Sequence, residues 1–401
     1  MKSLPRYPGQ LDWLKRLFEE CHQAFLADRP VDKALGAAFR RFPNLGAKDR
    51  RFYGTAIFGL YRYWGWLRGT VSPDPLLGLY LAYFLEEEPP SQLWSEALGL
   101  PAAPDFPPRG LNAKLAWIRT FVPQANLEDL TPKFLPPFGP STLEALSQRP
   151  PTWIRLAGNG KFSLQLGQIK HHRHQHLNTA IALEQPLDLQ PYLGEVEIQD
   201  LSSQAVGLAC AAQPGQSWLD LCAGAGGKAL HLWQQMKGKG RLVLTETRES
   251  TLAEARERFG STKGVEFVWL ATDHNLDLGG GFDGVLVDVP CSGSGTWGRA
   301  PWLRWQLTPK VLAELAPLQS ALLAQGASQV KPGGVLLYAT CSLLEVENQG
   351  IVQAFLAQHP EFSLAPFADP LTGKPTAGER LVLPEEEDSN GMYFCRMKRV
   401  V

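Results

Sequence analysis

LDLCAGAGGKALHL, residues 219–232, is the stretch that decides the fold of this 401-residue chain. An apolar run passes into a turn of glycines and alanines, after which apolar residues recur at helical spacing. Glycine has no side chain, so the backbone can turn tightly and approach a ligand, and the helix that follows offers free N–H groups at its N-terminus. The stretch therefore predicts a strand, a ligand-binding turn and a helix.

The same alternation of strand and helix continues towards the C-terminus. Helical patterns cover 227–236, 249–259, 308–330 and 345–358, and a strand pattern precedes each of them. Such alternation is typical of a mostly parallel, doubly wound α/β sheet, which binds its ligands at the carboxyl ends of the strands. The predicted strands are 217–222, 241–246, 265–270, 282–290, 333–340 and 392–398.

The glycine turn leaves two cofactors open. A phosphate-binding Walker loop is excluded, because Cys222 stands where its first glycine should be and Ala229 stands where it needs Ser or Thr. Gly224, Gly226 and Ala229 satisfy the dinucleotide pattern G-x-G-x-x-G/A, and Glu246 follows Gly226 by 20 residues, where an acid can bind ribose hydroxyls. The same geometry serves S-adenosylmethionine, so the turn alone does not choose between it and NAD.

Two cysteines follow neighbouring strands of the predicted sheet. Cys291 comes just after Asp288 at the end of the fourth strand, and Cys341 comes at the end of the fifth. Consecutive strands on one side of the switch point lie side by side, so both thiols should face the cofactor cleft. A nicotinamide enzyme has no general need for two thiols beside an acid.

Methylation of a pyrimidine at carbon 5 does need these groups. A thiolate adds to carbon 6, and the ring becomes an enamine that attacks the sulfonium methyl group. A second group must then help to remove the carbon-5 proton and release the thiol, while a carboxyl group near N3 stabilises the electron-rich ring. An amino-methylating enzyme would show an aromatic residue after a Pro-Pro pair here, whereas this chain has Val289-Pro290-Cys291.

These motifs resemble the Nol/Nop/Sun family of RNA cytosine-5 methyltransferases, and within it the bacterial RsmB type that acts on small-subunit ribosomal RNA. The resemblance covers nearly all of residues 198–397 and rests on several segments in combination. These segments are QDLSSQAVG, DLCAGAGGK, DGVLVDVPCSGSG, PWLRW, KPGGVLLYATCSLLEVEN and DSNGMYFCRM.

The resemblance implies a fold and three domains. It predicts a Rossmann-like class I methyltransferase domain at 198–401, an all-helical NusB-like RNA-binding domain at 1–145 and a small linking α/β subdomain at 146–197. Apolar residues at helical spacing in LDWLKRLFEECHQAFL and DRRFYGTAIFGLYRYWGWL independently favour a helical N-terminal part.

The resemblance also implies roles for individual residues. Cys341 would be the nucleophile, Cys291 would assist release, and Asp288 would hold the pyrimidine edge and contact the cofactor. Glu246 stands where most members have aspartate, and this longer acid should still reach a ribose. The predicted S-adenosylmethionine-binding residues are Cys222, Ala223, Gly224, Ala225, Gly226, Gly227, Lys228, Glu246, Asp273 and Asp288.

Basic charge is concentrated at the N-terminus, although the formal net charge of the whole chain is only −1. Residues 1–70 hold 13 lysines and arginines against 6 aspartates and glutamates, an excess that favours contact with RNA phosphates. In the segment TWGRAPWLRWQ we favour RNA binding for Arg299 and packing for Trp305. The predicted RNA-binding residues are Arg40, Arg41, Lys48, Arg50, Arg51 and Arg299, with Arg62 in the same basic group.

The remaining expectations concern environment and partners. No signal-peptide core or membrane-length apolar run is present, so we expect a cytoplasmic protein. The 6 cysteines form no CxxC pair, so we expect reduced thiols and no metal. We also expect a monomer. The histidines at 171, 172, 174 and 176 are interpreted as a solvated, weakly basic face. The hypothesis is an S-adenosylmethionine-dependent RNA cytosine-5 methyltransferase acting on small-subunit (16S) ribosomal RNA. The alternatives are a transfer RNA methyltransferase, a non-catalytic RNA-binding assembly factor and a nicotinamide oxidoreductase.

Overall fold

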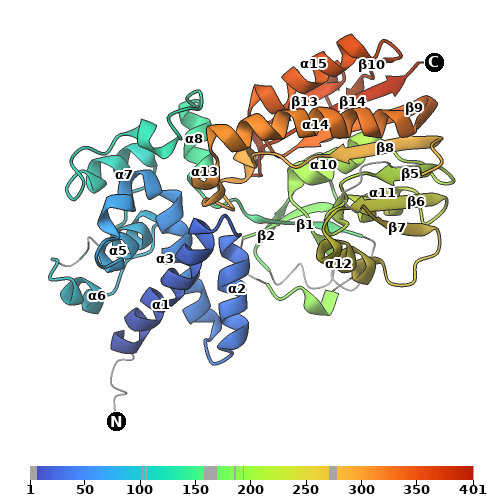
Figure 1. Ribbon diagram of the computed structural model, residues 1–401. Helices are drawn as coiled ribbons and strands as arrows, with labels where there is room; N and C mark the ends of the chain where they lie inside the picture. Colours follow the sequence, from blue (N-terminus) through green and yellow to red (C-terminus); the bar gives the residue numbers. More distant parts are fainter. Residues whose placement is uncertain are drawn as a thin grey trace. The chain divides into compact units, whose positions relative to one another are not determined.

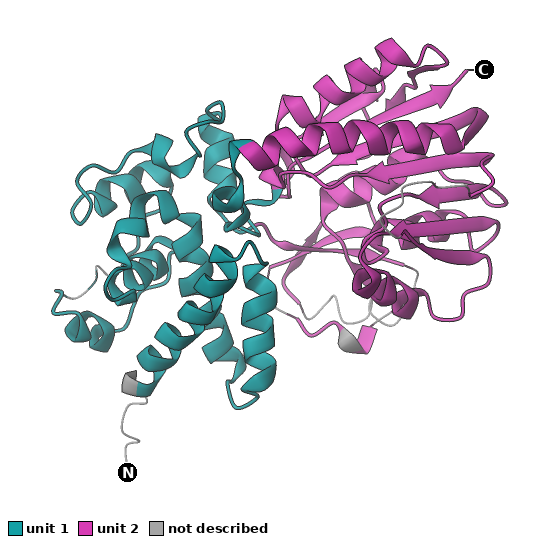
Figure 2. Ribbon diagram, in the orientation of Figure 1, with its two compact units in different colours: residues 1–149, 296–309 teal, residues 150–295, 310–401 magenta. Residues whose placement is uncertain are grey.

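The computed structural model describes residues 7–101, 103, 106–157, 169–184, 187–192, 194–270 and 278–400. The chain divides into two compact units (Figure 2). Unit 1 comprises residues 1–149 and 296–309, and unit 2 comprises 150–295 and 310–401. Residues 296–309, which the sequence analysis placed inside the methyltransferase domain, thus pack with the N-terminal helices.

Unit 1 is helical in its described part, as expected for the N-terminal region. Its helices are amphipathic: α2 (Val31–Arg41), for example, buries Val31, Leu35 and Ala38, which recur every three or four residues along one face. The other helices are α1 (Tyr7–Leu26), α3 (Ala47–Arg62), α4 (Trp64–Leu67), α5 (Leu76–Leu85), α6 (Gln92–Ala97), α7 (Leu111–Ile118), α8 (Pro140–Leu146) and α13 (Leu303–Gln306).

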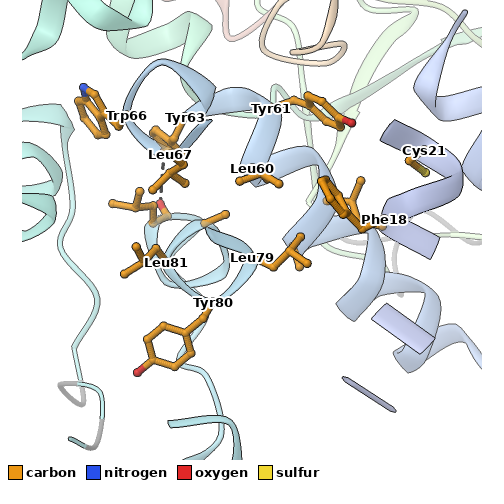
Figure 3. Close-up of a cluster of buried hydrophobic side chains, with 14 of the residues drawn as sticks. Phe18, Cys21, Leu60, Tyr61, Tyr63, Trp66, Leu67, Leu79, Tyr80 and Leu81 are labelled. Atoms are coloured by element: carbon orange, nitrogen blue, oxygen red, sulfur yellow. Dashed lines mark hydrogen bonds between the residues drawn. The ribbon is translucent and has the colours of Figure 1, made fainter. Parts of the chain in front are cut away.

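The core of unit 1 is rich in aromatic residues. Side chains from α1, α3, α4 and α5 gather in one buried cluster, part of which is drawn in Figure 3 with Phe18, Leu60 and Leu79 among the labelled residues. Trp302, just before α13, belongs to the same cluster and is 4% exposed. The segment 296–309 therefore supplies part of this core.

Two buried arginines attach that segment to the helices. Arg304 donates to the carbonyl oxygens of Leu130 and Leu146, both at 2.9 Å, and its guanidinium lies 5.0 Å from the centre of the Trp297 ring. Arg62 donates to the carbonyl of Gly298 at 2.7 Å. Because a buried guanidinium must keep its hydrogen bonds, these contacts fix the segment in register against the helices.

Unit 2 begins with a small antiparallel sheet in the order β2-β3-β1-β4. Every strand in it has three to five residues, and β1 pairs with both β3 and β4. Its apolar residues close a small core of their own, which includes Ile154 and Ile181. The strands are β1 (Thr152–Leu156), β2 (His171–Arg173), β3 (Ala180–Leu183) and β4 (Val196–Ile198).

The main sheet has the order β10-β14-β9-β8-β5-β6-β7, with β13 paired to β14. Strands β9, β8, β5, β6 and β7 are parallel to their neighbours, whereas β14 is antiparallel to β9. This confirms the predicted Rossmann-like, mostly parallel sheet (Figure 1). The strands are β5 (Ser217–Asp220), β6 (Arg241–Glu246), β7 (Val265–Trp269), β8 (Phe282–Asp288), β9 (Val330–Thr340), β10 (Phe362–Leu364), β13 (Glu379–Val382) and β14 (Met392–Arg399).

Helices cover both faces of the main sheet. Alternate residues of each strand point to opposite faces, so Trp218 and Leu219 of β5 enter two different cores. The Trp218 core is closed by α10 (Leu201–Cys210), α11 (Gly227–Gln235) and α12 (Glu249–Phe259). The Leu219 core is closed by α14 (Pro309–Gln329) and α15 (Gln349–Gln358). With both faces buried, the carboxyl edge of the strands is where polar side chains can gather.

Candidate active site

The two cysteines meet at the carboxyl edge of the sheet. Strands β8 and β9 are parallel neighbours, with Asp288 opposite Ala339 in the register. The loops that follow them bring the sulfur atoms of Cys291 and Cys341 to 3.3 Å from each other. Both thiols are free and partly exposed. The sequence prediction that the two thiols share one site is consistent with this geometry.

The surroundings of Cys291 disfavour loss of its proton. The hydrogen bond to Cys341 is the largest influence on Cys291, and together with burial and the charges of Cys341 and Glu347 it raises the pKa of the Cys291 thiol well above its usual value. Either of the two thiols can donate the hydrogen bond between the sulfur atoms.

Asp288 is paired with a lysine from the glycine turn. The Nζ of Lys228 donates to Oδ2 of Asp288 at 2.7 Å. Burial alone would lower the pKa of Lys228, but the charge and hydrogen bond of Asp288 outweigh it and raise that pKa overall. The charge of Cys341 acts in the same direction. The ammonium group of Lys228 thus lies beside Asp288 and within electrostatic reach of Cys341.

The glycine turn has the predicted conformation. Gly224 and Gly226 have φ angles of +54° and +80°, which L-residues with a side chain rarely adopt. A Cβ atom on Gly226 would lie 3.2 Å from Phe259 and 3.3 Å from Ala255, so the turn also passes close to α12. Helix α11 begins at Gly227, and its N-terminus faces the carboxyl edge of the sheet.

Asp220 is a site residue that the sequence analysis did not select. It ends β5 and is 1% exposed, and no side chain among the described residues donates a hydrogen bond to its carboxylate. Burial, followed by the charge of Asp288, raises the pKa of Asp220 to about 7. An unpaired buried carboxylate beside a glycine turn fits a ligand that carries positive charge, such as S-adenosylmethionine with its sulfonium and ammonium groups.

Glu246, predicted to bind the ribose, ends β6, and the two residues that follow it donate hydrogen bonds to its carboxylate. Oε1 accepts from the backbone N–H of Thr247 at 2.9 Å and of Arg248 at 3.0 Å, and the Arg248 guanidinium reaches both carboxylate oxygens. Burial works against ionisation, but the bonds from Arg248 prevail and lower the pKa of Glu246. Arg248 is the only one of these donors on Oε2, which keeps room to accept from a ribose hydroxyl.

Cys222 and Asp273 were also predicted to bind the cofactor. Cys222 lies at the end of the first strand, and burial followed by the charges of Asp220 and Asp288 raises the pKa of its thiol. This agrees with packing under the turn rather than with a third catalytic thiol. Asp273 falls outside the described residues, so its predicted role near the adenine stays a prediction.

The predicted RNA-binding residues lie in unit 1. Arg40 and Arg41 end α2, and Lys48, Arg50 and Arg51 lie in α3; all five are exposed. Two of them have acidic partners, Arg41 with Glu20 and Arg51 with Glu88. Arg299 is partly exposed and lies in the segment 296–309.

Arg62 does not belong to this basic surface. Its side chain is 1% exposed and pairs with Glu86 at 2.5 Å, besides its bond to Gly298. The interpretation of Arg62 as a phosphate contact is therefore wrong. Sequence counts positive charges but does not tell a buried guanidinium, which needs internal partners, from a solvated one.

The histidine segment also differs in part from its interpretation as a solvated face. His172 and His176 are exposed, but His174 is buried, and its Nε2 lies 3.0 Å from Oε2 of Glu387. Its Nδ1 accepts from the backbone N–H groups of His176 and Leu177, which leaves the proton on Nε2 to donate to Glu387. Among the described residues no group of three or more His, Cys, Asp or Glu is arranged to hold a metal ion.

Across the ranges that the structure covers, no helix combines the length and the apolar character that a bilayer crossing needs.

Comparison with known proteins identifies similar sequences and folds. The "Ribosomal RNA small subunit methyltransferase B" of Yersinia pseudotuberculosis serotype O:1b (strain IP 31758) is 32% identical over 268 residues, which are 64% of this chain and 61% of that protein. The protein of the same name from Yersinia pestis gives the same values. This chain therefore spans about three fifths of the length of the curated relatives that it matches.

Two solved structures share the fold. The crystal structure of PH0851 superposes with a TM-score of 0.74 at 22% identity, over 98% of this chain and 99% of that one. NSun6 from Pyrococcus horikoshii with SFG superposes with a TM-score of 0.57 at 17% identity, over 65% of this chain and 94% of that one.

The most direct family evidence comes from the sheet and its strand ends. Residues 208–398, which carry the glycine turn and both cysteines, match the protein family described as "16S rRNA methyltransferase RsmB/F". Over these residues the chain is similar to the RsmB/F family of methyltransferases.

Proposed function

We propose that this protein transfers a methyl group from S-adenosylmethionine to carbon 5 of a cytidine in small-subunit (16S) ribosomal RNA. The observation that carries the proposal is the pair of sulfur atoms 3.3 Å apart, beside an aspartate that is paired with a lysine. The similarity of residues 208–398 to the RsmB/F family and the names of the curated relatives support the reaction class and the RNA. S-adenosylmethionine would supply the electrophilic methyl group.

Cys341 forms the covalent bond to the cytosine. In this mechanism the Cys341 thiolate accepts the S–H of Cys291, whose sulfur lies 3.3 Å away, and the Lys228 charge is within electrostatic reach. The thiolate adds to carbon 6, and the electron pair displaced from the C5–C6 bond makes carbon 5 nucleophilic. The target base must be unpaired or flipped out of a helix for carbon 6 to reach the sulfur.

Asp288 and Lys228 act on the opposite edge of the ring. A carboxyl group at N3 and the exocyclic amine stabilises the charge that builds up when sulfur adds to carbon 6. The 2.7 Å bond from Lys228 leaves Oδ1 of Asp288 for the base and fixes the orientation of the carboxyl group. Lys228 thereby couples the glycine turn to the pyrimidine position.

Cys291 acts after methyl transfer. Two of the influences that keep it protonated, the hydrogen bond to Cys341 and the charge of Cys341, disappear once the Cys341 sulfur is bonded to carbon. The pKa of Cys291 must then fall, and its thiolate can take the carbon-5 proton while the C6–S bond breaks. The same sulfur is thus an acid early in the reaction and a base late in it.

The experiment that tests the proposal is methyl transfer to isolated ribosomal RNA. The full chain is incubated with methyl-labelled S-adenosylmethionine and unmethylated small-subunit RNA, with transfer RNA in a parallel reaction, and bisulfite sequencing then maps 5-methylcytosine. The proposal expects label at carbon 5 of one cytidine in the small-subunit RNA. Label only in transfer RNA would correct the substrate, and binding of RNA without methyl transfer under conditions that saturate the cofactor would overturn the activity.

A further inference from the structure

A buried carboxylate lies behind the two thiols. Glu347, in the short 3-10 turn η6 (Glu345–Glu347) after β9, is 0% exposed and accepts four hydrogen bonds. Oε1 accepts from the backbone N–H of Ser292 at 2.8 Å and from Nε2 of Gln319 at 2.9 Å. Oε2 accepts from the hydroxyl groups of Ser292 and Ser342, both at 2.5 Å.

The donors come from the loops that carry the cysteines. Ser292 follows Cys291 in the chain and Ser342 follows Cys341, so one carboxylate joins the residues next to both sulfur atoms. Gln319 of α14 also donates to the carbonyl oxygen of Pro290, on the other side of Cys291. A movement of either thiol relative to the other would break at least one of these bonds.

A second set of bonds fixes Glu347 itself. The hydroxyl of Tyr338 donates to the backbone carbonyl of Glu347 at 2.7 Å. Asn348 accepts from the hydroxyl of Thr340 at 2.5 Å and donates to the carbonyl of Ser342 at 2.9 Å. These contacts hold the turn η6 against the end of β9, so the carboxylate is a rigid part of the site.

The charge of Glu347 is not neutralised by a basic side chain. In the part of the chain that the structure describes, Glu347 forms no ion pair with a lysine, arginine or histidine, and its four partners are neutral donors. The titratable groups that act on Cys291 are Cys341 and Glu347, and Cys291 in turn acts on Tyr338. The ammonium group of Lys228 is engaged by Asp288. A bare negative charge facing Cys291 opposes loss of its proton.

We propose that Glu347 is a positioning residue that holds the two thiols at their reactive separation and keeps the proton on Cys291, so that Cys341 is the nucleophile. The inference rests on the proposed function, because a reaction that uses two thiols in different roles needs this asymmetry. A carboxylate kept only for packing would be replaceable by the isosteric amide without effect on either thiol.

The test measures thiol reactivity and needs neither RNA nor cofactor. Cys291 is alkylated with iodoacetamide between pH 6 and 11 in Cys341→Ala and in Cys341→Ala/Glu347→Gln, and peptide mass spectrometry follows the modification. The proposal expects the pH midpoint for Cys291 to move down by about one unit when the charge is removed. The matched control is Glu345→Gln, which removes the same charge from an exposed position two residues earlier and should leave the midpoint in place.

The proposal that Glu347 holds the two thiols close together is tested separately, by the rate at which they form a disulfide. In the protein with both cysteines, diamide takes two electrons and two protons from the thiols and joins them in a disulfide. Ser292→Ala removes one donor but keeps the carboxylate, and we expect at least threefold slower disulfide formation. This variant also carries the test if Glu347→Gln fails to fold, as judged by circular dichroism.

An unchanged midpoint in folded Glu347→Gln, or an unchanged disulfide rate in Ser292→Ala, would overturn the role of Glu347. Neither result would change the outcome of the methyl-transfer assay with the full chain, so the role of Glu347 can be disproved while the proposed function stands.

Discussion

At the scale of single residues, three cysteines at strand ends have three different chemical settings. Cys222 is packed under the glycine turn, Cys291 has a raised pKa, and Cys341 lies 3.3 Å from the Cys291 sulfur. The sequence placed Cys291 and Cys341 at one site because consecutive parallel strands end at the same edge. The burial of the Glu347 carboxylate cannot be predicted from sequence, since it depends on contacts with segments far away in the chain.

Asp220 was missed because an aspartate at a strand end is common and its isolation is visible only in three dimensions. Its raised pKa makes a stability prediction. The folded protein keeps the proton on Asp220 up to about pH 7, whereas the unfolded chain loses it near pH 3.8, the pKa of an ordinary aspartate. The folded state therefore bears an increasing cost as the pH rises from about 4 to 7, and this cost is absent at lower pH.

The variant Asp220→Asn removes this titration. Relative to the original protein, its free energy of unfolding should increase between pH 4.5 and pH 8, by up to about 4 kcal/mol for a shift of about three pKa units. Denaturant unfolding of both proteins across that range measures the difference. If the difference in free energy of unfolding between the two proteins does not change with pH, Asp220 is already ionised in the folded chain and the prediction is wrong. At pH 8 the variant should also bind S-adenosylmethionine more weakly, because it lacks the buried negative charge beside the glycine turn.

At the scale of secondary structure, long or strongly patterned elements were predicted well and short ones were not. The parallel strands and α14 match their predicted ranges closely. The predicted helix 345–358 starts instead at Gln349, because residues 345–347 form the turn that directs Glu347 inwards. Strands β2, β3 and β4 have only three or four residues each, too few for alternation to show in sequence.

Two adjacent glycines, Gly226 and Gly227, should respond differently to substitution by alanine. Gly226→Ala places a side chain at a φ of +80° and within 3.4 Å of Phe259, Ala255 and Leu244, so it should destabilise the protein by about 1–3 kcal/mol. Gly227→Ala, at the first residue of α11, meets nothing within 4 Å and should be neutral or slightly stabilising for the fold. Thermal unfolding of the two variants compares them directly. Equal losses of stability would contradict the conformational argument.

At the scale of the whole molecule, the two units share the chain in an unexpected way. The segment 296–309 follows the Cys291 loop directly, yet it is built into the core of the helical unit through Trp302, Arg304 and the ring of Trp297. Sequence analysis assigned it to the methyltransferase domain because it lies between two strands of that domain. The bonds from Arg304 to Leu130 and Leu146 span more than 150 residues, and no local pattern encodes them.

This arrangement predicts that residues 150–401 do not fold well alone. A chain of residues 150–401 would expose Trp297 and Trp302 and leave the Arg304 guanidinium without its carbonyl partners. We expect it to be aggregated or to melt at a markedly lower temperature, and co-expression with residues 1–149 should restore solubility. Gel filtration and circular dichroism are the measurements. A monomeric 150–401 fragment with the melting temperature of the full chain would refute the shared core.

The central claim, that Cys341 attacks the cytosine and Cys291 is needed for its release, is tested most directly by trapping the adduct. Cys291→Ala and Cys341→Ala are each incubated with S-adenosylmethionine and small-subunit ribosomal RNA, separated by denaturing electrophoresis and mapped by mass spectrometry. Cys291→Ala should accumulate a covalent protein–RNA species attached through Cys341, and Cys341→Ala should form none and lose turnover. A Cys291→Ala enzyme that turns over at the normal rate without an adduct, or an adduct attached elsewhere than Cys341, would contradict the account.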